Sequence, residues 1–165
     1  MRDARRLAKL ADNPRVTLIE GDVLDAEVLD HAVAGQDVVY ANLAGDMERQ
    51  ARTIVTAMDK AGVRRLIFIS SMGIYDEEPG EHHGSVLDPY RNSAKVVEAS
   101  DLDYTIIRPA WLDDQDEIAY GTSRKGDSFV NSNATVSRMS VADLVVKLAM
   151  KHDMGLRESL GVHAA

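Results

Sequence analysis

Polar side chains follow several short apolar runs of this sequence, at the points where strands of a sheet would end. Asp22 follows the first run, Asn42 the second, and Ser70 and Ser71 the third. Because ligands of an open parallel sheet bind outside the carboxyl ends of its strands, we expect these side chains to converge on one crevice. Carboxylate, carboxamide and hydroxyl groups in such a crevice can orient a ligand through hydrogen bonds.

The residue types disfavour several other chemistries. The chain has no cysteine, so a redox function would have to be carried by a bound cofactor. Ser71 has no GxSxG surroundings, which argues against a hydrolase. His82 and His83 are adjacent, point in different directions and have no third ligand at metal spacing. We therefore expect an exposed loop there and no metal site.

The apolar pattern alternates strands with helices, which is typical of βαβ units and a parallel sheet. The expected strands are Val16–Ile19, Asp37–Ala41, Arg65–Ser70 and Tyr104–Ile107. The last two are apolar without alternation, as buried parallel strands are. The expected helices are Arg2–Asp12, one capped by Asp25 and ended by Gly35, one over about 46–61 ended by Gly62, one capped by Asp88 that runs to about Ser100, and one signalled by Ser140 that runs to about Lys151.

The composition fits one domain spanning residues 1–165. Its net charge of −8 argues against binding to nucleic acid, which needs a basic face. No apolar run approaches the roughly 18 residues of a membrane span, and no apolar segment follows the charged N-terminal residues. We therefore expect no membrane partner and a cytoplasmic protein.

Several local strings resemble those of one family. They are Gly21-Asp22-Val23, Asn42-Leu43-Ala44-Gly45, the stretch 69–75, Lys95 in the following helix, and Arg108-Pro109-Ala110. In this order they resemble an atypical short-chain dehydrogenase/reductase, and most closely the NmrA-like, NAD(P)H-binding subgroup. The stretch 137–144 resembles the start of that subgroup's last helix, so the resemblance covers almost the whole chain. It implies a Rossmann-like, doubly wound parallel sheet, NADP or NAD as the cofactor, and a small-molecule substrate of unknown identity.

The resemblance also implies roles for individual residues. Asp22 would accept a hydrogen bond from the adenine amino group, Val23 would lie against the ring, and Arg2 would meet the 2′-phosphate of NADP. The riboses and the nicotinamide would be bordered by Asn42, Leu43, Ala44, Ser70, Ser71, Lys95, Pro109, Ala110 and Trp111. The candidate catalytic residues are Ser71, Lys95 and Tyr90.

Each assignment has an ordinary structural alternative. Asp22 fits a turn before a helix, and strand-end serines such as Ser70 and Ser71 commonly bond to the local backbone. Lys95 fits a solvated helix face, and Trp111 fits packing under a loop. The functional interpretation depends on the coincidence of all these positions.

The sequence departs from the family at the catalytic tyrosine. That tyrosine stands four residues before the lysine, where one helical turn brings the phenol beside the ammonium group. Here the position is Arg91, and Tyr90 is rotated by about 100° around the helix. Tyr75 belongs to the loop after a strand. This departure favours cofactor binding over carbonyl reduction.

The second departure concerns the pyrophosphate. None of the glycines forms the GxGxxG or GxxGxxG turn that cradles it, so the sheet is expected to lack the first βα unit and most of the second strand, about 40 residues in all. The strand Val38–Ala41 would then be an exposed edge. We expect this edge to close onto Val16–Ile19, to pair with another chain in a homo-oligomer, or to leave the protein marginally stable.

Three functional hypotheses follow from these patterns. The first is an NAD(P)-dependent oxidoreductase or a close relative of one. The second is a non-catalytic NAD(P)-binding sensor that reports redox state through a partner. The third is a truncated remnant that binds no dinucleotide and acts as an interaction module.

Overall fold

A five-stranded sheet forms the centre of the computed structural model, which describes residues 3–76, 84–127, 130–131 and 133–165. Its order is β1-β2-β3-β7-β5, and a second sheet pairs β4 with β6. The strands are β1 Val38–Ala41, β2 Arg65–Ile69, β3 Asp103–Pro109, β4 Trp111–Asp113, β5 Gly121–Arg124, β6 Thr135–Ser137 and β7 Glu158–His163. The helices are the 3₁₀ helices Arg5–Leu10 and Gly84–Leu87 and the α-helices α1 Ala26–Val33, α2 Met47–Ala61, α3 Asp88–Glu98 and α4 Arg138–Met150.

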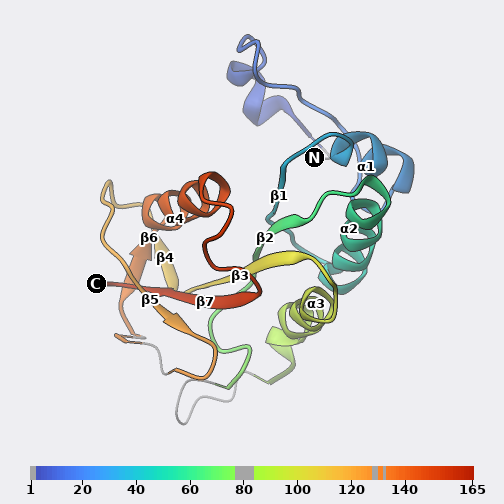
Figure 1. Ribbon diagram of the computed structural model, residues 1–165. Helices are drawn as coiled ribbons and strands as arrows, with labels where there is room; N and C mark the ends of the chain where they lie inside the picture. Colours follow the sequence, from blue (N-terminus) through green and yellow to red (C-terminus); the bar gives the residue numbers. More distant parts are fainter. Residues whose placement is uncertain (1–2, 77–83, 128–129, 132) are drawn as a thin grey trace.

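The central sheet is mostly parallel, as expected. Strands β1, β2, β3 and β7 run in one direction, and β5 pairs antiparallel with β7 at the far edge. The register of Phe68 opposite Ile106 brings the carboxyl ends of β2 and β3 to the same edge of the sheet. Helices α1, α2 and α3 cover one face and α4 covers the other (Figure 1).

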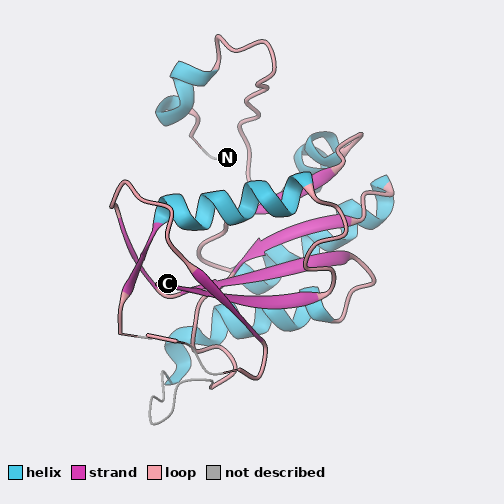
Figure 2. Ribbon diagram, turned by 60° about the vertical axis from the view of Figure 1, so that its left-hand side comes forward, coloured by secondary structure: helices cyan, strands magenta, loops and turns pink. Residues whose placement is uncertain are grey.

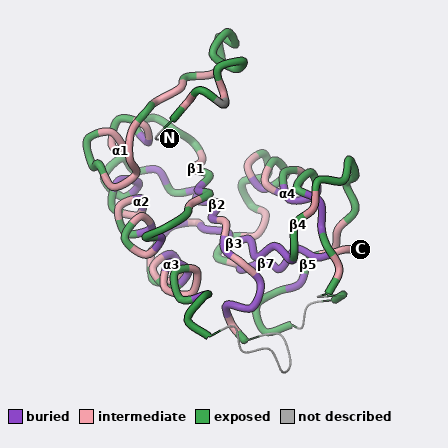
Figure 3. Tube along the Cα trace, turned by 180° about the vertical axis from the view of Figure 1, so that it is seen from behind, coloured by how far each residue is buried: buried purple, intermediate pink, exposed green. Residues whose placement is uncertain are grey.

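Alternating residues of the central strands β2 and β3 supply two separate apolar cores. On β2, Leu66 and Phe68 belong to the core under α2 and α3, whereas Ile67 belongs to the core under α4. All three are fully buried, which explains why this strand is apolar without alternation. The buried residues follow the central strands, with exposed helix faces outside them (Figure 3). The doubly wound α/β expectation is confirmed.

Helix ends agree with the sequence patterns in part. The Asp25 carboxylate accepts hydrogen bonds from the amides of Glu27 and Val28, and Gly62 ends α2 in the left-handed conformation, both as predicted. The predicted Asp88 cap is wrong, because the first turn of α3 follows directly on a 3₁₀ turn and Leu87 takes the cap position without a side-chain bond. The predicted Ser140 cap is also wrong, since the Ser137 hydroxyl caps α4.

The N-terminal segment differs most from expectation. Val16–Ile19 is not a strand, because the central sheet of the described residues begins at β1 and does not include this segment. The predicted helix Arg2–Asp12 is a short 3₁₀ helix with no side-chain cap. In the ribbon views the N-terminal segment projects from the sheet (Figures 1 and 2). The expected closure of Val16–Ile19 onto β1 does not occur.

Strand β1 is the edge of the sheet, as predicted, and in the part of the chain that the structure describes it pairs only with β2. Strand β7, which the sequence patterns did not reveal, lies between β3 and β5. None of the described helices is both long and apolar enough to traverse a bilayer.

Candidate functional site

The site lies where β1, β2 and β3 end at one edge of the sheet. Asn42 follows β1, Ser70 and Ser71 follow β2, and Ala110 follows β3. The chain after β2 remains attached to β3, because the Ser70 amide donates to the carbonyl of Ile107 over 2.8 Å. The two serines are therefore held rigidly beside the end of β3.

A cavity of about 390 Å³ opens at this edge. It brings together eight of the residues expected to bind the cofactor or act in catalysis: Asn42, Leu43, Ser70, Ser71, Tyr90, Pro109, Ala110 and Trp111. Ile69, Leu112 and Arg138 complete the lining. Tyr90 reaches the cavity from the first turn of α3, so its place beside Ser71 does not depend on Lys95.

The polar groups of this cavity are mostly neutral. They comprise one carboxamide, the hydroxyls of two serines and a tyrosine, and the Arg138 guanidinium, which pairs with Asp114 over 2.7 Å. Ser70 is buried, and its Oγ has no hydrogen-bond partner among the described residues. A buried hydroxyl without a partner costs free energy that a hydrogen-bonding ligand can recover.

A second, apolar cavity of about 240 Å³ adjoins the first. The two share Ser71, Pro109, Ala110 and Trp111, and the apolar one adds Met72, Val86 and Leu87. Ser71 therefore lies at the junction of a polar cavity and an apolar one.

The remaining predicted residues lie outside the 390 Å³ cavity. Lys95 is exposed on α3, and the Ala44 carbonyl accepts a hydrogen bond from Gln50. Asp22 forms a turn, accepting from the Leu24 amide over 3.0 Å, and Val23 packs against the core under α2 and α3. Arg2, His82 and His83 lie outside the described residues.

Arg91, at the position of the family's tyrosine, points away from the cavity. Its Nη1 donates to the carbonyl of Gly84 over 2.8 Å, and its Nε donates to the carbonyl of Ile74 over 3.2 Å. The guanidinium also pairs with Asp76 and Asp88. Arg91 thus joins the chain after β2 to the segment that enters α3.

Tyr75 also serves packing in this structure. Its hydroxyl donates to Glu98 over 2.6 Å and contacts Ser159 Oγ at 3.2 Å, which ties the loop after β2 to α3 and β7. Burial, and then the neighbouring Glu98 carboxylate, raise the pKa of Tyr75 above its usual value.

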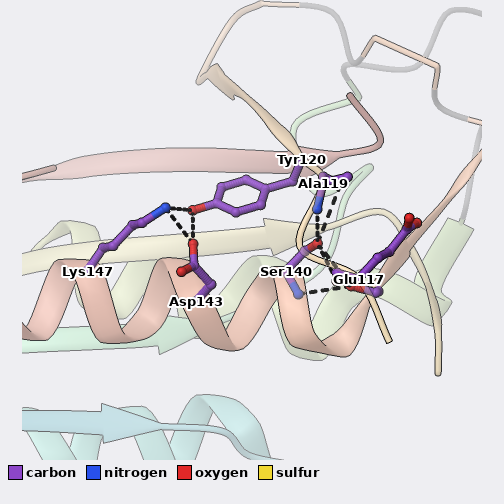
Figure 4. A network of polar contacts seen from close by, with 7 residues as sticks. Glu117, Ala119, Tyr120, Ser140, Asp143 and Lys147 are labelled. Atoms are coloured by element: carbon purple, nitrogen blue, oxygen red, sulfur yellow. Dashed lines mark hydrogen bonds and ion pairs between the residues drawn. The ribbon is translucent and has the colours of Figure 1, made fainter. Parts of the chain in front are cut away.

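The segment after β4 is fixed to α4 by a polar network (Figure 4). The Tyr120 hydroxyl donates to Asp143 over 2.7 Å, and Lys147 donates to the same hydroxyl over 3.2 Å. The Ala119 amide donates to Ser140 Oγ over 3.0 Å. Hydrogen bonding from Lys147 lowers the pKa of Asp143. This network anchors the chain that leads away from Trp111.

Sequence reasoning missed several lining residues. Arg138, Met72 and Val86 have no motif of their own, although Arg138 and Met72 stand inside strings that carried the resemblance. For Arg138 and Met72 the available signal was their place inside these strings, whereas Val86 had no such signal.

Comparisons with known proteins agree with this architecture. A family model described as NAD(P)H-binding matches residues 1–152. A Rossmann-fold NAD(P)-binding family protein from Shigella flexneri is 40% identical, with a TM-score of 0.78, and the match covers 88% of this chain and 68% of that chain. A short-chain dehydrogenase/reductase from Veillonella parvula in complex with NADP is 28% identical, with a TM-score of 0.84 and coverage of 94% and 75%.

A curated relative is much longer than this chain. The N-acetyl-alpha-D-glucosaminyl-diphospho-ditrans,octacis-undecaprenol 4-epimerase of Escherichia coli O157:H7 is 35% identical over 98 residues, which are 50% of this chain and 29% of that protein. Together the matches confirm the Rossmann-like fold and the dinucleotide class of cofactor.

Proposed function

Because the chain belongs to the NAD(P)H-binding family, we propose that it is an oxidoreductase whose polar cavity holds the nicotinamide half of NADPH or NADH. The observation that carries the proposal is the convergence of Asn42, Ser70, Ser71 and Tyr90 with the end of β3 on one cavity. The carboxyl edge of a parallel sheet is where such cofactors bind.

The chemistry of the lining fits this half of the cofactor. Nicotinamide and its ribose are neutral hydrogen-bonding groups in the reduced cofactor, and the cavity offers one carboxamide and three hydroxyls to them. The buried Ser70 hydroxyl, which lacks a partner within the described chain, gains one when a carboxamide or ribose group binds. The single cation, Arg138, is already paired with Asp114, so the lining does not fit a pyrophosphate.

The proposed reaction is reduction of a carbonyl group. When bound, the reduced nicotinamide supplies a hydride to the substrate. Ser71 lies at the junction of the two cavities, where its hydroxyl can donate a hydrogen bond to the substrate oxygen, and the phenol of Tyr90, which lines the polar cavity, would supply the proton that this oxygen takes up. Lys95 is exposed away from this cavity, so Tyr90 acts without the ammonium partner of the family pattern.

Energy transfer from tryptophan to reduced nicotinamide tests cofactor binding directly, because Trp111 is the only tryptophan and lines the cavity. We expect saturable transfer with NADPH, weakened about 5- to 30-fold by Asn42→Ala through loss of one or two hydrogen bonds. Gln36→Ala, an exposed amide before the amino end of β1, is the matched control. Absence of binding at millimolar NADPH would contradict the proposal. It would leave the hypothesis of an interaction module that binds no dinucleotide.

A second candidate function is a non-catalytic NmrA-like redox sensor. Arg91 at the position of the family's tyrosine, turned toward backbone carbonyls, favours this alternative. A screen of carbonyl and quinone substrates with NADPH distinguishes the two. Turnover that falls at least tenfold in Tyr90→Phe, with unchanged NADPH affinity, supports the oxidoreductase. Tight NADPH binding without turnover of any substrate supports the sensor.

A further inference from the structure

The apolar cavity differs in kind from the polar cavity that it adjoins. Its lining adds Met72, Val86 and Leu87 to the shared residues, and among the described residues Ser71 supplies its only hydroxyl group. None of the described residues that line it has a charged side chain. A ligand in this cavity is therefore recognised by apolar contact and by about one hydrogen bond.

Two large apolar side chains stand at this cavity with much of their surface in solvent. Trp111 is 64% exposed and Val86 is 77% exposed. The backbone of Trp111 is fixed, because β4 pairs with β6 and places Trp111 opposite Thr135. An indole that is open to solvent offers a flat surface on which another aromatic ring stacks favourably.

The size of the cavity and the nearby charges narrow the ligand class further. The cavity of about 240 Å³ is smaller than the roughly 300 Å³ at which drug-sized sites begin, so the ligand is small. Asp113 and Asp114 lie two and three residues after Trp111, and Asp114 pairs with Arg138. Sugar diphosphates need cations and many polar partners, which this lining does not supply.

We propose that this apolar cavity is the substrate subsite and takes an uncharged aromatic compound with a single carbonyl oxygen. The ring stacks on Trp111 between Val86 and Met72, and the carbonyl oxygen accepts a hydrogen bond from Ser71. The proposal rests on the proposed function, because the shared lining puts that oxygen beside the nicotinamide cavity. It differs from the substrate named for the curated epimerase, which is a glucosaminyl-diphospho-lipid.

Binding of 2-acetylnaphthalene to the full chain tests the ligand class by calorimetry and by quenching of Trp111 fluorescence. We expect saturable binding, at least threefold tighter than that of 2-ethylnaphthalene, which lacks the carbonyl oxygen. Ser71→Ala should abolish this preference without weakening 2-ethylnaphthalene. UDP-N-acetylglucosamine should not compete. Competition by the sugar diphosphate, or equal affinity of the two naphthalenes, would overturn the proposal.

A pair of valine variants tests whether 2-acetylnaphthalene binds in the apolar cavity. Val86→Asp places a carboxylate at the mouth of the apolar cavity, and we expect it to weaken 2-acetylnaphthalene at least tenfold. Val146→Asp makes the same change at an exposed valine of α4 and should leave the affinity unchanged. Equal effects of the two variants would contradict the assignment.

The cofactor measurement separates this proposal from the one on which it rests. If NADPH binds but 2-acetylnaphthalene does not, the aromatic subsite is wrong and the cofactor site stands. If 2-acetylnaphthalene binds with the expected variant effects but NADPH does not, the subsite stands and the oxidoreductase is wrong.

Discussion

Arg91 and Gly84 are joined by a hydrogen bond of 2.8 Å from the guanidinium Nη1 to the backbone carbonyl oxygen. The same guanidinium donates from Nε to the carbonyl of Ile74. One side chain therefore connects the chain after β2 with the 3₁₀ turn that carries Val86 and borders the apolar cavity.

Arg91→Met is expected to lower the free energy of unfolding by about 1–2 kcal/mol, because the half-buried carbonyl of Ile74 and the exposed carbonyl of Gly84 lose a charged donor. Affinity for 2-acetylnaphthalene should fall with it, whereas NADPH affinity should stay within about twofold. Arg91→Lys should restore only part of the lost stability and of the affinity for 2-acetylnaphthalene, since an ammonium group lacks the planar fork that bridges separate carbonyls. Arg52→Met, at an exposed ion pair of α2, is the control. Parallel loss of both affinities would show general unfolding and contradict a positioning role.

Tyr75→Phe is expected to cost about 1 kcal/mol at neutral pH through loss of the bonds to Glu98 and Ser159. The pKa of Tyr75 is raised in the folded state from an ordinary value of 10.0. Its stabilising contribution is therefore complete below pH 10 and is lost as the pH rises through the folded pKa. Urea unfolding between pH 8 and about pH 11 should show the difference between wild type and Tyr75→Phe shrinking above pH 10. A constant difference would be inconsistent with the raised pKa.

Arg65→Met is expected to destabilise the protein by about 3 kcal/mol. The Arg65 guanidinium is buried and donates to the carbonyls of Asp103 and Met154, at 2.8 and 3.0 Å, and to Thr105 Oγ1 at 2.9 Å. The methionine fills similar space but leaves these acceptors without a donor. Arg64→Met, the adjacent exposed arginine paired with Asp101, should cost less than about 1 kcal/mol in the same urea titration. Similar losses for the two variants would refute this account.

The open edge of β1 predicts self-association through this strand. Tyr40 is 48% exposed on β1 and is not needed by either core, so Tyr40→Lys adds a charge that opposes pairing of strands. Sedimentation velocity should show wild type associating as its concentration rises and Tyr40→Lys remaining smaller. Val146→Lys on α4 is the control. A monomeric wild type at all concentrations would contradict the prediction.

Much of the sheet could be predicted because its central strands are simple. The stretch 66–69 is an apolar run without alternation, as is most of the stretch from Tyr104 to Ile107, and this pattern is typical of a strand buried on both faces. Strand β7 escaped detection because Ser159, Gly161 and His163 alternate with only two large apolar residues, Leu160 and Val162. These small and polar residues are buried by the neighbouring strands, which local pattern does not report.

The candidate site could likewise be predicted only in part from the sequence. The convergence of Asn42, Ser71 and Ala110 follows from strand direction alone, so it could be predicted. The orientation of a helical side chain depends on how the helix packs, and the sequence did not show that Tyr90 would line the cavity while Lys95 remained exposed. Val16–Ile19 has the composition of a strand but joins neither of the two sheets in the described part of the chain, and composition alone does not form a strand.

Pairing of β3 with β7 joins Thr105 to Glu158, and the chain between them carries Trp111 and the whole of α4. Closing so long a loop is entropically costly, so we expect β3 and β7 to pair only when the intervening chain packs against the sheet. We therefore expect the wall of the crevice and the middle of the sheet to unfold as one cooperative unit. Amide hydrogens of Val136 and Leu160 should then exchange with solvent at the same slow rate.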